Sequence, residues 1–262
     1  HPATTTHQRL PAEEKARLGI GPGSLLDMTP RARAAIERAE VVAGYTTYIR
    51  LIEPLLADKE VIGTGMMHEI DRCRMAVEAA ASGKETVVVS SGDAGVYGMA
   101  GLVLELVLQR EVAERPHFGG VIAGVSAVNA AASILGAPLM HDFAVISLSD
   151  LLTPWETICK RAEMAAAGDF VIALYNPKSK KRVQHIEEIR RIALKYRDPQ
   201  TPVGIVTAAS RAEQAKTIST LADFTKETIN MFSLVIIGNS QTYVKEGWML
   251  TPRGYGRKES GL

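Results

Sequence analysis

The segment 86–101 constrains the fold more than any other part of the chain. Residues 86–89 form a β-branched run, which is typical of a buried parallel strand, and the sequence SSGDAGVYGMAG follows directly at 90–101. An apolar helical pattern then begins near Val96 and continues to about Val112. A strand, a glycine-rich loop and a helix in this order predict a βα unit of an open sheet, where ligands bind beyond the carboxyl ends of the strands. Glycines there allow backbone N–H groups to approach a ligand, although a plain βα turn is the alternative interpretation.

Strand-like and helix-like segments alternate along the whole chain. The predicted strands are 41–44, 61–65, 86–90, 119–123, 143–148, 170–175, 202–207 and 233–238. The predicted helices are 30–40, 69–82, 96–112, 125–135, 155–167, 179–195 and 211–219. Such alternation predicts an α/β fold with mostly parallel sheets. A Pro/Gly cluster at 116–120 suggests two α/β domains, an N-terminal one at 1–118 and a C-terminal one at 119–262, each large enough for its own core.

Composition excludes several classes of protein. The net charge of the 262 residues is +1 and the charges are dispersed, so no basic face predicts a nucleic-acid partner. No apolar run reaches the roughly 18–20 residues that span a bilayer, and no secretory h-region is present, so we expect no membrane partner and a cytoplasmic location. Cys73 and Cys159 both lie in predicted helices and are expected to be buried, reduced thiols. The histidines show no HxxxH or HxH spacing, so no metal site is predicted.

A second glycine-rich loop, GIGPGS at 19–24, has the appearance of a dinucleotide fingerprint but fails as one. Ser24 stands where the third glycine is needed, and Pro22 removes a backbone donor. The loop is therefore either a structural turn or a substrate loop, and its residues favour neither. The preceding segment 13–18 is charged, which predicts a first strand that is short or at a sheet edge, unless the N-terminus differs from the natural one.

Other polar residues follow predicted strands. Ser126 and Asn129 lie in the first turn of a predicted helix. Their polar atoms could bind a polar or anionic ligand group, or could serve only as an N-cap, and the sequence leaves both interpretations open. Tyr175 and Asn176 end a strong strand, and Pro177 prevents its continuation. The basic run 178–182 that follows is interpreted as a solvated helix face.

A third polar cluster follows the predicted strand 61–65. Glu69 and Arg72 share one helical face beside His68, and a surface ion pair is favoured over an active-site pair.

Taken together and in this order, these segments resemble the tetrapyrrole methylases, a family that uses S-adenosylmethionine in corrin and sirohaem synthesis. The GxGPG loop and the Gly-Asp loop are marks of the whole family. The strings ISLSDLLTPW at 146–155, LYNPKSKKR at 174–182 and TPRGY at 251–255 are similar to its ring-contracting branch, which methylates C-17 of precorrin-3B to give precorrin-4 in cobalamin biosynthesis. The resemblance extends from Gly19 to Tyr255. The charged residues before the GxGPG loop depart from it.

The resemblance implies two α/β domains with one S-adenosylmethionine folded between them, usually in a homodimer. It places the cofactor contacts on Gly92, Asp93, Val96, Tyr97, Ser126, Ala127, Tyr175, Asn176, Thr207 and Ala208. It places the tetrapyrrole against Gly21, Pro22 and Gly23.

Two groups of residues follow from the implied chemistry. A substrate with many carboxylates is expected to meet cationic clamps, for which the candidates are Arg72 and Arg253, followed by Arg50 and Lys178. Ring contraction also needs a base at the C-20 hydroxyl, and the candidate catalytic residues are Glu69, His68, Asp93 and His141.

Four alternatives to this function remain open. They are a sibling methylase acting at another ring position, the same step on a cobalt-loaded macrocycle, a diphthine-forming enzyme, and a nucleotide-binding module without catalysis.

Overall fold

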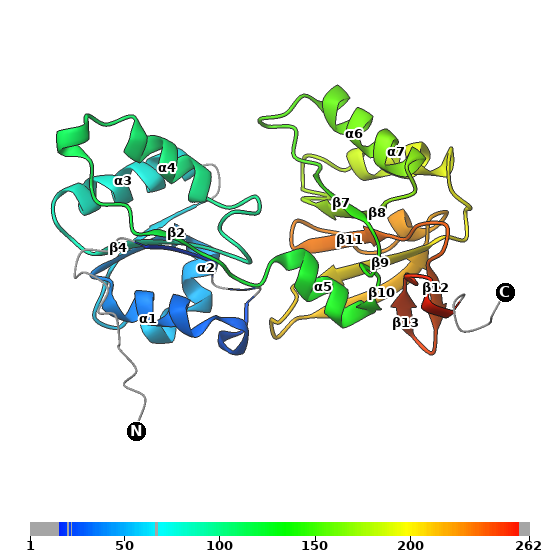
Figure 1. Cartoon of the computed structure of the whole chain (residues 1–262), viewed down its shortest axis with the longest axis horizontal. Coiled ribbons are helices and arrows are strands. Elements are labelled where there is room, and N and C mark those ends of the chain that lie inside the picture. Colours follow the sequence, from blue (N-terminus) through cyan, green and yellow to red (C-terminus); the bar gives the residue numbers. More distant parts are fainter. Residues whose placement is uncertain (1–15, 20, 22, 66–67, 257–262) are drawn as a thin grey trace, which may run out of the picture. The chain divides into compact units, whose positions relative to one another are not determined.

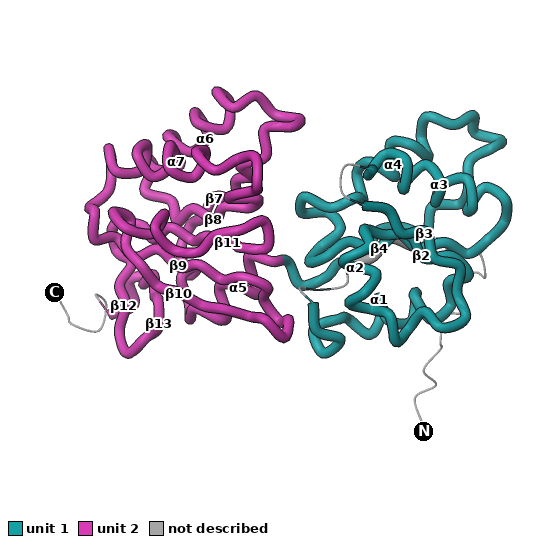
Figure 2. The backbone as a smooth tube through the Cα atoms, turned by 180° about the vertical axis from the view of Figure 1, so that it is seen from behind, with its two compact units in different colours: residues 1–126 teal, residues 127–262 magenta. Residues whose placement is uncertain are grey.

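The computed structural model describes residues 16–256 except 20, 22, 66 and 67. The chain divides into two compact units, unit 1 at His1–Ser126 and unit 2 at Ala127–Leu262 (Figure 2). The sequence-based boundary between 118 and 119 differs from this division by eight residues. The reason is that β5 (Gly120–Ile122), predicted to open the second domain, pairs with a strand of unit 1. Each unit is described by itself.

Unit 1 contains a wholly parallel sheet in the order β3-β2-β4-β1-β5. Its other strands are β1 (Ala16–Gly19), β2 (Val41–Tyr45), β3 (Glu60–Thr64) and β4 (Thr86–Ser90). The first strand is short, as its charged sequence suggests. It does not lie at an edge, however, because it pairs with β4 on one side and β5 on the other.

Helices cover both faces of this sheet (Figure 1). They are α1 (Pro30–Arg38), α2 (Thr46–Leu51), α3 (Glu69–Ala81) and α4 (Ala100–Leu108), with 3-10 turns at Leu25–Asp27, Glu53–Leu55 and Val112–Glu114. Successive side chains of a strand point to opposite faces. Val42 therefore packs in the core with α1, whereas Val41 and Ala43 pack with α3 and α4.

The main sheet of unit 2 has the order β10-β9-β11-β8-β7. Its strands are β7 (Phe143–Ser147), β8 (Val171–Tyr175), β9 (Pro202–Thr207), β10 (Ala215–Thr220) and β11 (Ser233–Ile237). Only β7 and β8 pair in parallel. The α/β fold class is confirmed, with a parallel sheet in unit 1 and a mixed sheet in unit 2.

The helices of unit 2 also cover both faces of its sheet (Figure 1). One core contains α6 (Trp155–Ala167) and α7 (His185–Leu194), and the other contains α5 (Ala127–Leu135). A smaller sheet joins β6 (Gly136–Ala137), β12 (Tyr243–Lys245) and β13 (Trp248–Leu250), and a 3-10 turn lies at Phe224–Lys226.

The predicted helix at 211–219 is wrong. Residues 215–220 form β10, which pairs antiparallel with β9 and places Ile218 opposite Gly204. Two predicted helices begin later than expected, at Ala100 and at His185. In the first case the left-handed backbone of Tyr97, with φ of 53°, does not fit a helix.

Candidate functional site

The two glycine-rich loops of unit 1 are joined by their backbones. Gly21 N donates to Gly92 O at 3.1 Å, and Gly92 N donates to Gly21 O at 2.8 Å. Gly92 has a φ of 68°, which is a conformation that favours glycine. Its backbone groups are therefore occupied by the other loop, and its N–H is not free to approach a ligand as the sequence suggests. Gly23 is half-buried at a bend of the chain, and Pro22 lies outside the described residues.

Asp93 organises the loop that follows β4. Its carboxylate oxygen Oδ2 accepts from Gly95 N at 2.9 Å, and Oδ1 accepts from Gly124 N at 2.8 Å. The side chain thereby links the loop after β4 to the loop after β5. Both oxygens are used as acceptors of backbone N–H groups, which favours a positioning role and disfavours the predicted role of Asp93 as a base.

In unit 2 three strands end at the same edge of the main sheet. β7 and β8 are parallel, and β9 runs in the direction of β8 because β11 is antiparallel to both. Ser147, Tyr175 and Thr207 therefore occupy one carboxyl edge. The predicted cofactor residues thus form two groups, one in each unit, and each group lies at the carboxyl edge of its own sheet.

The residues of the unit 2 edge are held in place by hydrogen bonds. The Tyr175 hydroxyl accepts from Val128 N at 3.0 Å, in the first turn of α5 that Ala127 begins. Asn176 has a left-handed backbone, with φ of 49°, and its amide Nδ2 donates to Ser147 Oγ at 2.9 Å. Helix N-termini and fixed amide groups at a strand edge suit a polar ligand.

The end of β9 also carries a left-handed residue that hydrogen bonds hold in place. Ala208 is also left-handed, with φ of 52°, and its N–H donates to Phe232 O at 3.1 Å. The hydroxyls of Thr207 and Ser233 are 2.7 Å apart. Left-handed backbone at a non-glycine residue costs free energy, and such residues cluster at functional sites.

None of the other three candidate bases, His68, His141 and Glu69, has a fully buried side chain. The His68 side chain is 60% exposed, with Nδ1 3.6 Å from Asp71 Oδ2. The His141 side chain is 48% exposed, with Nδ1 3.6 Å from Asp142 Oδ2. Glu69 is half-buried in the first turn of α3. His68 and Glu69 are consecutive residues of unit 1, whereas His141 lies in unit 2.

The expected surface ion pair between Glu69 and Arg72 is wrong. Arg72 is only 4% exposed, and its Nη1 donates to Thr64 Oγ1 at 2.8 Å. Its guanidinium carbon lies 6.0 Å from the centre of the Tyr45 ring. Arg72 is thus a buried cation at the carboxyl ends of β2 and β3.

The other candidate clamps differ in exposure. Arg50 and Arg253 are exposed, and Lys178 is half-buried.

Sequence reasoning missed a network around Arg182. This residue was interpreted as part of a solvated face, but it is half-buried, and its Nη1 donates to Leu148 O and to Asn176 O, both at 3.0 Å. Nearby, His185 Nε2 lies 2.9 Å from Asp150 Oδ2. The hydrogen bond with His185 is the main cause that lowers the pKa of the Asp150 carboxyl. The strings 146–155 and 174–182 contain all of these residues except His185, so the family resemblance is the signal in the sequence that points to this network.

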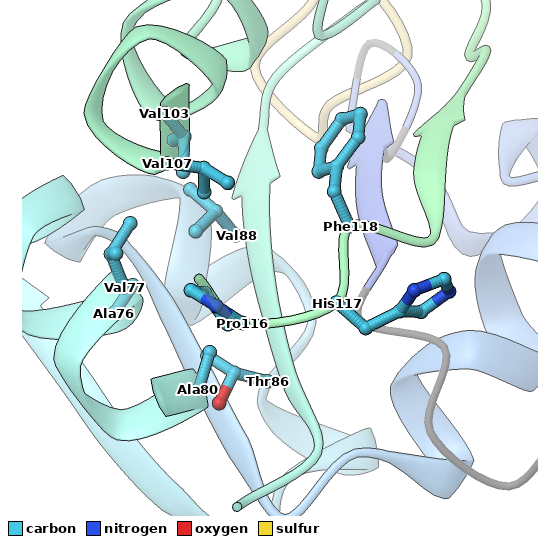
Figure 3. Close-up of a pocket in the computed structure, with 10 residues that line it drawn as sticks. All are labelled: Ala76, Val77, Ala80, Thr86, Val88, Val103, Val107, Pro116, His117 and Phe118. Atoms are coloured by element: carbon cyan, nitrogen blue, oxygen red, sulfur yellow. The ribbon is translucent and has the colours of Figure 1, made fainter. Parts of the chain in front are cut away.

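An apolar hollow in unit 1 lies away from these edges. Figure 3 shows Ala76, Val77, Ala80, Thr86, Val88, Val103, Val107, Pro116, His117 and Phe118 around it. None of the predicted site residues lines it, and its lining from α3, α4 and β4 belongs to the core of unit 1.

Within the described part of the chain, no group of three or more His, Cys, Asp or Glu residues could hold a metal ion, and no helix has the length and apolarity needed to cross a membrane. Neither Cys73, which is buried, nor Cys159, which is half-buried, forms a disulfide.

Comparison with known proteins identifies the family. Residues 17–225 match the family described as Tetrapyrrole (Corrin/Porphyrin) Methylases. The chain belongs to the tetrapyrrole methylases. This agrees with the resemblance stated above.

Several tetrapyrrole methylases are similar over most of the chain. The "Cobalt-factor III methyltransferase" of Priestia megaterium is 50% identical over 92% of this chain, which spans 45% of that relative. The "Probable cobalt-factor III C(17)-methyltransferase" of Salmonella typhimurium is 50% identical over 91% of the chain and 98% of the relative. The "Precorrin-3B C(17)-methyltransferase" of a Sinorhizobium species is 37% identical over 91% of the chain and 95% of the relative.

Two solved structures have the same fold. The methyltransferase CobJ superposes with a TM-score of 0.84 at 36% identity, covering 90% of this chain and 98% of that one. The uroporphyrin-III C-methyltransferase of Thermus thermophilus, solved with S-adenosylhomocysteine, superposes with a TM-score of 0.64 at 21% identity, covering 86% and 92%. The second likeness concerns the fold alone.

Proposed function

We propose that this chain transfers a methyl group from S-adenosylmethionine to C-17 of a precorrin-3B-type tetrapyrrole, with contraction of the macrocycle, in cobalamin biosynthesis. The observation that carries this proposal is the 50% identity to the relative named "Probable cobalt-factor III C(17)-methyltransferase", of which the chain covers 98%. The similarity to CobJ over nearly its full length supports it. We also propose that the enzyme works as a homodimer in the cytoplasm.

S-adenosylmethionine would supply an already activated methyl group on its sulfonium. The residues present fit such a cofactor, because the unit 2 edge offers the Tyr175 ring, the fixed Asn176 amide and the strained backbone at Ala208. In unit 1, the loop that Asp93 organises lies beyond the carboxyl end of β4, where ligands of open parallel sheets bind. What the chain must supply is alignment, and holding two reactants in a productive geometry is worth about 7–11 kcal/mol of the barrier.

Ring contraction requires a proton to be removed at the C-20 hydroxyl as well. Of the four candidates, Glu69 and His68 carry this role best in our proposal, because the Asp93 oxygens already accept two backbone N–H groups. The peripheral carboxylates of the substrate would meet cationic side chains. Arg72 is the first candidate, since a buried guanidinium gains from an anionic partner, and Arg253 is the second.

Two measurements test this function. Isothermal titration of the folded chain with S-adenosylhomocysteine should show one site per chain. Incubation with S-adenosylmethionine and precorrin-3B should yield a product with one more methyl mass and the spectrum of the contracted ring. Absence of binding, or a methylated product at another ring position, would contradict the proposal.

The cobalt-loaded macrocycle is the second candidate substrate. It is favoured by one specific observation, namely that the relatives named for cobalt-factor III are 50% identical to this chain, against 37% for the relative named for precorrin-3B. Parallel incubations with the metal-free and the cobalt-loaded substrate, compared by kcat/KM, distinguish the two.

A further inference from the structure

The loops that follow β7 and β8 are joined by one guanidinium. Arg182 Nη1 lies 3.0 Å from Leu148 O, just beyond β7, and 3.0 Å from Asn176 O, just beyond β8. Arg182 N also donates to Ser179 Oγ at 3.0 Å, which closes the turn that carries the side chain. A charged donor shared between two carbonyls makes stronger hydrogen bonds than a neutral one. Arg182 therefore fixes the two loops to each other.

The residue that Arg182 holds is strained. Asn176 has a φ of 49°, in the left-handed region that non-glycine residues adopt at a cost. Such a conformation persists only where surrounding contacts determine it. Asn176 has two such contacts, since its carbonyl accepts from Arg182 and its side-chain amide donates to Ser147.

A second connection joins the loop that follows β7 to the start of α7, the helix that follows the loop after β8. Asp150, after β7, pairs with His185 at the start of α7 at 2.9 Å. The Trp155 ring lies against His185 with centroids 4.1 Å apart, and its indole Nε1 donates to Glu188 Oε2 at 2.8 Å. Arg182 is one of the groups that lower the pKa of the Asp150 carboxyl, after the bond with His185. The two connections are therefore electrostatically linked.

We propose that Arg182, supported by the Asp150–His185 pair, is a positioning residue for cofactor binding. It touches neither cofactor nor substrate in this proposal. It holds the strained Asn176, and with it the Asn176 amide, in the orientation that receives the adenosyl group. This inference rests on the proposed function, because it assumes that the unit 2 edge binds S-adenosylmethionine.

The chain provides a matched control one residue away. Lys181 belongs to the same basic run but is exposed, and so is Lys180. If the run served only as a solvated or anion-attracting face, Lys181 and Arg182 would be equivalent. If Arg182 positions Asn176, only its replacement should matter.

The test compares Arg182→Met, Arg182→Lys and Lys181→Met with the unchanged chain. We expect Arg182→Met to weaken S-adenosylhomocysteine binding about tenfold by isothermal titration, which corresponds to 1.4 kcal/mol. Lys181→Met should bind as the unchanged chain does. Arg182→Lys should recover part of the affinity, because an ammonium can still donate to both carbonyls.

A double-mutant cycle separates positioning from a general loss of structure. If Arg182 acts through Asn176, Arg182→Met should add little to the affinity loss of Asn176→Ala, whereas independent residues would give additive losses. Melting temperatures are recorded for every variant. Equal losses for Arg182→Met and Lys181→Met, or additive losses in the cycle, would overturn the inference. Failure of the unchanged chain to bind S-adenosylhomocysteine would instead overturn the proposed function.

Discussion

Replacing Asp93 by Asn tests whether this residue organises its loop. The carboxylate accepts Gly95 N at 2.9 Å and Gly124 N at 2.8 Å. Asn has one acceptor oxygen, so its NH2 group must face one of these two N–H donors. One charge-assisted bond is lost and the other becomes neutral. Bonds to charged groups contribute about 1.5–3 kcal/mol, so for this half-buried side chain we expect a loss of about 2 kcal/mol.

The assay is urea unfolding followed by far-ultraviolet circular dichroism, with hydrogen exchange of the Gly95 and Gly124 amides as the local readout. The free energy of unfolding should fall by about 2 kcal/mol for Asp93→Asn and by more for Asp93→Ala, which accepts neither N–H. Asp58→Asn is the matched control in the same unit, because the Asp58 side chain is 87% exposed and lies 3.8 Å from Lys59 Nζ. The Lys59 side chain is only 6% exposed, but its ammonium keeps its hydrogen bonds to Glu37 O and Ala39 O when the solvated Asp58 carboxylate is replaced, so the free energy of unfolding should change little.

Two outcomes would refute the reasoning. The first is an Asp93→Asn protein as stable as the unchanged chain, with unchanged exchange at both glycine amides. The second is a variant that methylates the substrate at the normal rate but no longer contracts the ring. That result would return Asp93 to the role of a base.

Three further predictions concern unit 2. Tyr175→Phe removes the acceptor of Val128 N and should lower the free energy of unfolding by about 1 kcal/mol. Its affinity for S-adenosylhomocysteine should be nearly unchanged because the ring remains. A large loss of affinity at unchanged stability would instead place the hydroxyl on the cofactor. Gly204→Ala would set a Cβ 2.5 Å from Leu135 Cδ1, so chemical denaturation should show about 1–3 kcal/mol of destabilisation, and a fully stable variant would contradict this. Burial raises the pKa of the Cys159 thiol to about 11. Alkylation of this thiol by iodoacetamide, followed by mass spectrometry, should therefore be slow at pH 8 and accelerate as the pH rises towards 11. Rapid alkylation at pH 8 would contradict the raised pKa.

The βα units of unit 1 were accessible to sequence reasoning because their signals are local. The β-branched run at 86–89 lies in β4, and the helix predicted at 30–40 is α1, which has Thr29 as its N-cap and Pro30 as its first residue. The pairing of Gly21 with Gly92 was not accessible, since it joins two loops that are distant along the chain. The sequence leaves a ligand loop and a structural turn open for both segments, and the backbone pairing shows that Gly21 and Gly92 serve the contact between the two loops.

Non-local contacts also explain the two larger errors. Residues 215–220 include the β-branched Thr217, Ile218 and Thr220, which favour a strand over the predicted helix, and antiparallel pairing with β9 makes the segment β10. Arg182 follows the exposed Lys181 in the same basic run, so the sequence does not distinguish the two. What distinguishes Arg182 is its contact with the carbonyls of Leu148 and Asn176, which are distant in the sequence. Propensity describes a residue and its neighbours, whereas these positions are decided by tertiary partners.

The position of β1 between β4 and β5 has a consequence for synthesis on the ribosome. Among the described strands of unit 1, β1 is made before its two partners, of which β4 ends at Ser90 and β5 ends at Ile122. At translation rates of about 5–20 residues per second, both edges of β1 lack a partner for roughly 4–14 s until β4 is complete, and one edge lacks a partner for roughly 5–20 s until β5 is complete. Unpaired strand edges are templates for association with other chains. The nascent chain should therefore need protection during this interval, and slow codons before β5 should lengthen the exposure and lower the yield of folded protein.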